Sequence, residues 1–238
     1  GKTWEARNDR SDQLLVAASP NDFVADTHWY RPDFDAFLVE EAIRLGVEYH
    51  DETPLTACEI KAEGIQMAGT RHGKAFQARA GFLVDASGPR GYLHQALGLP
   101  EAQFEDFPRT RALFSHFTGV GSWAQDNPVF GDAPFPPDDA ALHHTFEGGW
   151  MWVLRFNNGV TSAGFAEVAN LDQPPMIEPA EAWRLFLERF PSIGRQFAPA
   201  QLLRPWARTE PLAFRTSRCV GPRWADRKST RLNSSHRL

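Results

Sequence analysis

The first periodic pattern of hydrophobic positions along the chain predicts a helix. Apolar residues recur every three to four positions between residues 34 and 45, which is the spacing of one helical face. Pro32 and Asp33 stand at the start of this stretch, and Gly46 stands where a left-handed C-terminal cap belongs. Residues 47–50 then alternate between apolar and polar side chains, so a short strand is expected directly after the helix.

The next patterns predict strands. Residues 55–60 have strand character, and the pieces 65–67 and 75–78 indicate a hairpin. The run 82–85 is apolar up to its terminal carboxylate, as in a parallel strand buried on both faces, and the small residues 86–88 follow it. A helix, a hairpin and such a strand indicate the α/β fold class, as part of a Rossmann-like nucleotide-binding domain.

From about residue 109 the pattern is that of an antiparallel sheet. The dipeptide Asn158-Gly159 separates two strand-like runs, 150–157 and 160–168, and is a strong hairpin signal. Pro179 lies near the start of a helix with one apolar stripe, and Pro191 ends it. The second part of the chain is therefore expected to be an α+β arrangement, an antiparallel sheet covered by one helix.

The composition excludes several classes of protein. Of the 238 residues, 42% are hydrophobic and 23% are charged, which is typical of a globular chain. The formal net charge of -5 argues against a nucleic-acid binder, which needs a basic surface. No apolar run approaches the ~18 residues of a membrane span. The two cysteines, Cys58 and Cys219, fit neither a disulfide framework nor a metal-binding motif, so a reducing cytoplasm is the expected compartment.

The C-terminal residues 226–238 are expected to be foreign to the fold. They are polar, lack an amphipathic period and resemble the translation of a sequencing-adapter oligonucleotide. We expect them to form a non-native tail without packed contacts. The rest is expected to be a fragment of a longer protein, divided into a partial cofactor-binding domain at 1–108 and a substrate-domain sheet at 109–225.

Two motif-like features are interpreted as structural. The stretch 119–124 matches G-x-G-x-x-A, but the Pro- and Gly-rich residues after it cannot form the helix that holds a pyrophosphate, so a turn is expected. His143 and His144 are adjacent and would point to opposite faces of a strand. They are therefore interpreted as sheet histidines rather than as metal ligands, and no metal site is expected.

Three segments resemble signatures of FAD-dependent oxidoreductases, the family that contains flavin monooxygenases, geranylgeranyl reductases and flavin-dependent halogenases. Residues 31–38, RPDFDAFL, are similar to the R-x-x-F-D-x-x-L helix start of this family. Residues 82–91, FLVDASGPRG, are similar to its hydrophobic strand that closes on D-A-S-G. Residues 93–99, LHQALGL, match its L-A-x-x-L-G-L stretch. The resemblance extends over roughly residues 1–225.

The resemblance implies FAD as the cofactor and indicates which residues would bind it. A cation at the helix entry can meet phosphate or ribose, and small residues at a strand end let the cofactor approach the backbone. The strand that begins at Leu55 is the one whose backbone contacts adenine in this family. The implied cofactor-binding residues are Arg31, Leu55, Asp85, Ala86, Ser87 and Gly88.

A further segment resembles one branch of this family in particular. Residues 150–155, WMWVLR, resemble the W-x-W-x-I-P stretch of flavin-dependent halogenases, whose tryptophans lie between flavin and substrate. The resemblance implies that Trp150 and Trp152, on one face of the predicted strand, are substrate-side residues. Arg155 replaces the proline of the pattern and puts halogenation itself in question. Aromatic residues packed in a sheet core are the alternative interpretation.

The expected parent protein is an FAD-dependent oxidoreductase similar to halogenases and monooxygenases, acting on a small organic substrate, with aromatic compounds included. A flavin reductase or NAD(P)H would supply electrons, and the catalytic residues stay unassigned. A geranylgeranyl-reductase-like enzyme and a non-catalytic binding or maturation protein on the same fold are the alternatives. The fragment alone is expected not to retain FAD, because the segment that holds the pyrophosphate would be absent.

Overall fold

The computed structural model describes seven stretches of the chain. For the first stretch it describes only the backbone. Its contacts group the chain into two units, which are described separately. Unit 1 comprises Gly1–Phe34 and Pro108–Pro211, and unit 2 comprises Asp35–Phe107 and Leu212–Leu238. The described residues are 13–16, 28–88, 90–102, 110–127, 136–168, 177–209 and 216–226.

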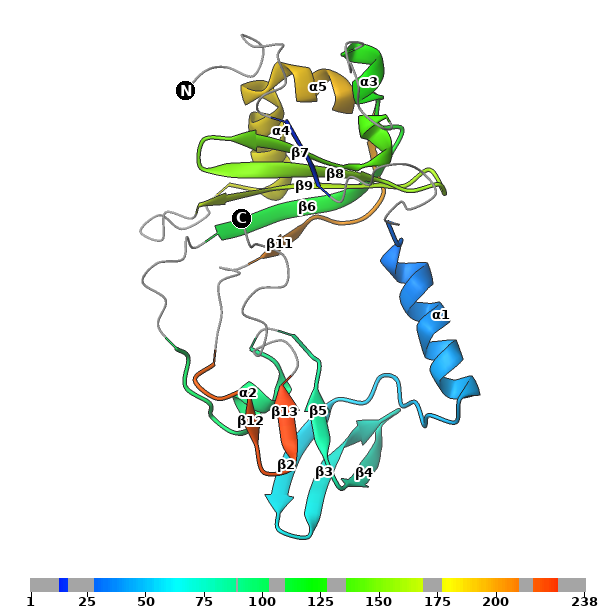
Figure 1. Cartoon of the computed structure of the whole chain (residues 1–238), viewed down its shortest axis with the longest axis vertical. Coiled ribbons are helices and arrows are strands. Elements are labelled where there is room, and N and C mark those ends of the chain that lie inside the picture. The colour runs from blue at the N-terminus through cyan, green and yellow to red at the C-terminus, as the bar shows by residue number, and fades with distance from the viewer. Residues whose placement is uncertain are drawn as a thin grey trace. The chain divides into compact units, whose positions relative to one another are not determined.

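Unit 1 is built on an antiparallel sheet of the order β1-β7-β8-β9-β6-β10, with β11 also paired to β6 (Figure 1). The predicted hairpin joins β8 to β9 through Asn158-Gly159, where Gly159 has φ 80° and the Val160 amide donates to Asn158 Oδ1 at 3.0 Å. The antiparallel sheet is therefore confirmed. Its strands are β1 (Gln13–Val16), β6 (Thr110–Thr118), β7 (Ala141–Phe146), β8 (Gly149–Arg155), β9 (Thr161–Val168), β10 (Gln201–Leu202) and β11 (Ala207–Thr209).

Two helices, rather than the single one expected, cover one face of this sheet. Helix α4 (Pro179–Arg189) begins at the predicted proline, and Pro191 does not merely end it but opens α5 (Pro191–Phe197). Proline suits the first position of a helix, which explains why it starts the second one. Both helices contribute buried residues to one hydrophobic cluster.

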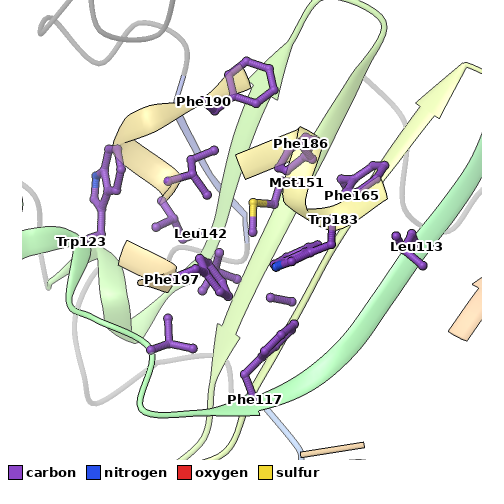
Figure 2. Packing of buried hydrophobic residues seen from close by; sticks show 14 residues of the cluster. Leu113, Phe117, Trp123, Leu142, Met151, Phe165, Trp183, Phe186, Phe190 and Phe197 are labelled. Atoms are coloured by element: carbon purple, nitrogen blue, oxygen red, sulfur yellow. The ribbon is translucent and has the colours of Figure 1, made fainter. Parts of the chain in front are cut away.

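The cluster between helices and sheet is largely aromatic. Figure 2 shows Trp183 and Phe186 of α4 facing Phe165 and Met151 of the sheet. The Phe186 ring stacks on that of Phe165 with centroids 4.3 Å apart, and Trp183 stacks on Phe117 at 5.2 Å. Stacked and edge-on rings add ~0.5–1.5 kcal/mol per pair to the burial of their surface. This cluster is the core of unit 1.

The two adjacent histidines of β7 lie on opposite faces, as predicted. His144 is 1% exposed on the helix-covered face, with its ring 4.7 Å from that of Trp123, whereas His143 is half-buried on the other face. Burial is the main cause that lowers the pKa of His144 to about 3. The neighbouring charge of His143 also lowers this pKa, whereas the charge of Asp138 raises it. His144 is therefore neutral in the folded protein at neutral pH.

This burial predicts a pH dependence of stability. Between pH 6.5 and about 3 the unfolded chain protonates His144 and the folded chain does not. The free energy of unfolding is therefore expected to fall by about 1.4 kcal/mol per pH unit on acidification within this window. Urea unfolding at several pH values should show a slope smaller by one proton for His144→Gln than for the unaltered protein. Equal slopes in the two proteins would contradict this assignment.

Unit 2 combines a three-stranded antiparallel meander, β2-β3-β4, with a second small sheet. In that second sheet β5 pairs in parallel with β13, and β12 pairs antiparallel with β13. The predicted hairpin and the parallel strand are therefore present. The elements are β2 (Leu55–Lys61), β3 (Gly64–Arg71), β4 (Lys74–Ala80), β5 (Leu83–Asp85), α2 (Tyr92–Ala96), β12 (Val220–Gly221) and β13 (Trp224–Asp226).

Helix α1 (Arg31–Arg44) runs from the end of the first N-terminal segment of unit 1 into unit 2. Gly46 has φ 90°, so the predicted left-handed helix end is confirmed. The strand expected at 47–50 is wrong, because these residues have no regular secondary structure and pair with no strand among those described. An alternating pattern forms a strand only where a partner completes its hydrogen bonds.

Two other expectations for unit 2 need correction. Strand β5 is not buried on both faces: Val84 is 59% exposed, because β13 is its one partner in the described part of the chain. Asp226 is not part of an unpacked tail, since it is 2% exposed, pairs with Asp85 across the parallel sheet, and donates its amide to the Cys219 carbonyl at 2.8 Å. Residues 227–238 lie outside the described residues.

The contact units change at residues 34–35, 107–108 and 211–212. The N-terminal strand β1 pairs with β7 and so joins the sheet of unit 1. The division into domains at residue 108 stays a prediction. No helix in the described stretches is long and apolar enough to span a membrane.

Candidate functional site

The turn after β5 in unit 2 is organised by the carboxylate of Asp85. Its Oδ1 accepts from the Ser87 amide at 2.8 Å and from Ser87 Oγ at 2.5 Å, and its Oδ2 accepts from the Leu93 amide at 2.7 Å. Ser87 Oγ in turn accepts from the Tyr92 amide at 2.8 Å. Both carboxylate oxygens are thus used to fasten the turn to the first amides of α2.

Asp85 is 6% exposed and shapes the backbone of residues 86–88, whose first two residues are exposed. Gly88 has φ 105°, and a Cβ there would meet nothing within 4 Å, so the backbone borders open space. Gly91 is the opposite case, because its Cβ would lie 2.3 Å from Ser87 Oγ and 2.8 Å from the Gly88 carbonyl oxygen.

The position of this turn suits a nucleotide cofactor. It follows the carboxyl end of β5, and β13 runs parallel beside it. Ligands of open parallel sheets bind outside the carboxyl ends of the strands, where bare backbone can be approached closely. The exposed turn at 86–88 fits FAD through its backbone, and Asp85 fits as the group that holds this backbone in place.

Leu55 lies at an irregular point of the meander. The pairing of β2 with β3 shifts register between Leu55 and Ala57, so Thr56 is skipped in the ladder. Gly69 opposite has no room for a side chain, since a Cβ would lie 2.4 Å from the Pro54 carbonyl oxygen. Bulges of this kind free backbone groups and are frequent beside functional sites.

The start of α1 lies beside the second face of the sheet in unit 1, the face that is left uncovered by α4 and α5. The Tyr30 ring packs edge-on against His116 at 6.0 Å and against Phe156 at 5.2 Å, and its hydroxyl accepts from Arg204 Nη2 at 3.4 Å. Burial and the charge of Arg204 lower the pKa of His116. Arg31 follows Tyr30 directly and is exposed. It belongs to unit 1 by contacts, whereas Leu55 and the turn after β5 belong to unit 2.

Trp150 and Trp152 point away from the helix-covered core. Along β8, Met151 and Val153 are buried in the core cluster, while both tryptophans are half-buried on the other face. Neither tryptophan belongs to the core cluster that the described residues form with α4 and α5.

The sequence missed the residues that stand beside Trp152 on this uncovered face. Strand register places His143, Trp152, Gly164 and Phe114 in one row across β7, β8, β9 and β6. The rings of Phe114 and Trp152 are 5.9 Å apart, and a Cβ on Gly164 would lie 2.3 Å from Phe114 Cβ and 2.7 Å from Trp152 Cζ2. Gly164 therefore lets two aromatic rings meet. Only the register reveals this row.

Arg155 lies on the helix-covered side and not beside the tryptophans. Its Nη2 donates to the carbonyls of Val120, at 2.9 Å, and Gly121, and its Nε lies 3.2 Å from Asp138 Oδ1. Alternation along β8 explains this, because residue 155 shares the parity of Met151 and Val153. The replacement of proline by Arg155 thus leaves the uncovered face unchanged.

The G-x-G-x-x-A stretch at 119–124 is only partly the predicted turn: residues 119–122 are irregular, and the last two residues of the stretch begin a helix, α3 (Trp123–Asp126). This helix has one turn, and its amino end is already occupied by a carboxylate. Asp138 accepts from the amides of Trp123 and Ala124, both at 3.0 Å, and from Ser122 Oγ at 2.7 Å. A pyrophosphate would have to displace this carboxylate. Among the described residues no cluster of His, Cys, Asp and Glu could hold a metal.

Comparisons with known proteins agree with this geometry. No protein-family model matches the chain. The monodechloroaminopyrrolnitrin halogenase PrnC of Pseudomonas fluorescens is 34% identical over 205 residues, which are 84% of this chain and 35% of that protein. The tetracycline 7-halogenase of Kitasatospora aureofaciens is 34% identical over 206 residues, 83% of this chain and 37% of that enzyme.

A solved halogenase structure is also similar to this chain in fold. A crystal structure of a mutant of the halogenase PltM in complex with FAD has a TM-score of 0.78 and 27% identity, covering 85% of this chain and 41% of that one. The chain thus spans little more than a third of the length of the curated relatives it matches.

Proposed function

The chain belongs to the FAD-dependent oxidoreductases of the flavin-dependent halogenase family, and from this we propose that the whole protein halogenates a small aromatic molecule. The observation that carries the proposal is the uncovered face of the sheet in unit 1. It presents Trp150, Trp152 and Phe114, while Arg155, the residue that departs from the family pattern, lies on the other side.

FAD, when bound, would supply the redox chemistry with oxygen, and the residues of this chain would hold and orient it. The backbone of residues 86–88 would lie against the cofactor, with Asp85 keeping that backbone in shape. Leu55 would contribute backbone groups at its bulge, and Arg31 a positive charge for phosphate or ribose.

The aromatic row would bind the substrate. Trp152 and Phe114 offer ring faces to a planar aromatic compound, and the half-buried His143 at the end of the row offers a polar ring nitrogen. The named substrates of the two curated relatives, monodechloroaminopyrrolnitrin and tetracycline, support an aromatic substrate here. A geranylgeranyl-reductase-like role has no comparable support.

The proposal extends to partners and compartment. Electrons would come from a flavin reductase or from NAD(P)H. Cys58 and Cys219 are both free thiols, which fits the reducing cytoplasm we propose as the location.

The test is a halogenation assay on the full-length protein with FAD, a flavin reductase, NADH, bromide or chloride, and a panel of phenols and pyrroles. Mass spectrometry should show a halogen-substituted product that depends on the halide. Hydroxylated product alone would identify a monooxygenase instead and overturn the proposal. Failure of the protein to retain FAD would refute the cofactor assignment as well.

Trp152→Ala in that full-length protein is expected to raise KM for the aromatic substrate about tenfold. A ring–ring contact contributes ~0.5–1.5 kcal/mol, and ~1.4 kcal/mol is a factor of ten in affinity. FAD retention, read from flavin absorbance, should stay unchanged. Val168→Ala, at the exposed end of β9, is the control and should leave both values unaltered. An unchanged KM in Trp152→Ala would remove Trp152 from the substrate side.

A further inference from the structure

Unit 2 contains a hollow of about 600 Å³ on the side opposite to the turn after β5. Its lining includes the tip of the β2–β3 hairpin, the residues after α2 and the turn between β12 and β13. These segments adjoin the amino ends of β5 and β13, where the Leu83 amide donates to the Arg223 carbonyl at 2.9 Å. The candidate cofactor turn lies at the carboxyl ends of the same strands, so the two places are distinct.

The floor of the hollow is apolar. Leu99 and Trp224 are buried and belong to one hydrophobic cluster, against which Ile60 and Leu97 are packed. A volume of this size lies within the range of small-molecule sites, ~300–1,000 Å³, and such sites combine an apolar floor with a few polar groups that fix orientation.

The rim is cationic. Arg223 donates through Nε and Nη2 to the Ala62 carbonyl, at 3.0 and 2.7 Å, and through Nη1 to the Gly81 carbonyl at 3.1 Å, so its position is held without a carboxylate. The Arg218 guanidinium lies 5.9 Å above the Trp224 ring. In the stretches that the structure describes, no acidic side chain pairs with either arginine.

The third rim cation has its own acidic neighbours. Lys61 Nζ lies 2.7 Å from Glu59, and the charges of Glu59 and Glu63 raise the pKa of Lys61. Lys61 is therefore largely compensated. Among the described residues, Arg218 and Arg223 have no acidic partner beside this apolar floor, and a guanidinium fork is well suited to a carboxylate.

We propose that this hollow is a binding site for a small amphipathic carboxylate, an alkyl or aryl acid. Its apolar part would lie on the half-buried Ile60 and Leu97, which pack against Leu99 and Trp224, and its carboxylate would pair with Arg218 and Arg223. The site is independent of the proposed halogenation, since it uses no residue of the cofactor turn or of the aromatic row.

The test compares octanoate with octanol on the complete chain, because the two share an alkyl tail and differ in charge. Trp224 is the only tryptophan that the sequence places in unit 2, so 5-fluorotryptophan labelling gives this unit one fluorine resonance. Titration should shift that resonance saturably with octanoate, and octanol should bind at least tenfold more weakly. The preference should shrink at high salt, which screens the exposed arginines.

Variants decide which charge is responsible. Arg218→Gln should bring the affinity for octanoate down to that for octanol, and Arg218→Lys should keep part of the preference. Arg44→Gln, an equal change of charge at an exposed position of α1, should leave it intact. Equal binding of octanoate and octanol, an unshifted resonance, or equal loss in Arg44→Gln would each overturn the proposal.

Discussion

Phe186→Ala is expected to lower the free energy of unfolding of unit 1 by about 3–5 kcal/mol, the usual cost of removing a buried phenylalanine ring. Phe186 is 6% exposed, and its ring meets Phe165 at 4.3 Å, Phe190 at 5.0 Å and Phe146 at 5.5 Å. Alanine would leave a cavity lined by three rings that cannot all close on it, because each is also held by its own strand or helix.

Leu185→Ala on the same helix is the matched control for this prediction. Leu185 is 41% exposed and lies outside the core cluster, so its loss should cost well under 1 kcal/mol. Urea unfolding followed by near-ultraviolet circular dichroism reports on the tryptophan-rich core of unit 1. Similar losses in the two variants would mean that α4 does not pack on the sheet through Phe186.

Asp85→Ala is expected to destabilise unit 2 by about 1–3 kcal/mol. It removes the acceptor of the Ser87 and Leu93 amides, and Leu93 is fully buried, so its amide is left without a partner. Each buried donor that loses its acceptor costs ~1–3 kcal/mol. Asp85→Asn should lose less, since one oxygen still accepts. Unfolding followed at the single tryptophan of this unit, Trp224, measures the difference.

The same variants test the cofactor role. In the full-length protein Asp85→Asn should weaken FAD binding at least tenfold, because the backbone at 86–88 is no longer held, whereas Asp51→Asn should leave it unchanged. Asp51 is an exposed carboxylate of the same unit that pairs with Arg71 at 2.9 Å. If both variants retain FAD equally, the turn after β5 does not bind the cofactor.

Much of the fold followed from local pattern. The helix from Arg31 with its glycine end, the β8–β9 hairpin at Asn158-Gly159 and the helix that opens at Pro179 all depend on neighbours within about four residues. Hydrophobic periodicity and turn-forming residues act over that same range, so these elements could be predicted from the sequence. Residues 47–50 alternate between apolar and polar side chains but form no strand, because they pair with no described strand. A local sequence pattern does not show whether a partner strand is present.

For the candidate site, the sequence by itself determined which residue types stand at the end of β5 and on β8, and the family resemblance followed from them. Only the tertiary structure decided what each one does. It turned the Asp85 carboxylate inward onto Ser87 and Leu93, placed Arg155 on the covered side of the sheet, and brought Phe114 and Gly164 beside Trp152. The physical reason is that side-chain direction and strand register are set by pairing between segments far apart in the chain, and periodicity alone does not specify the partner.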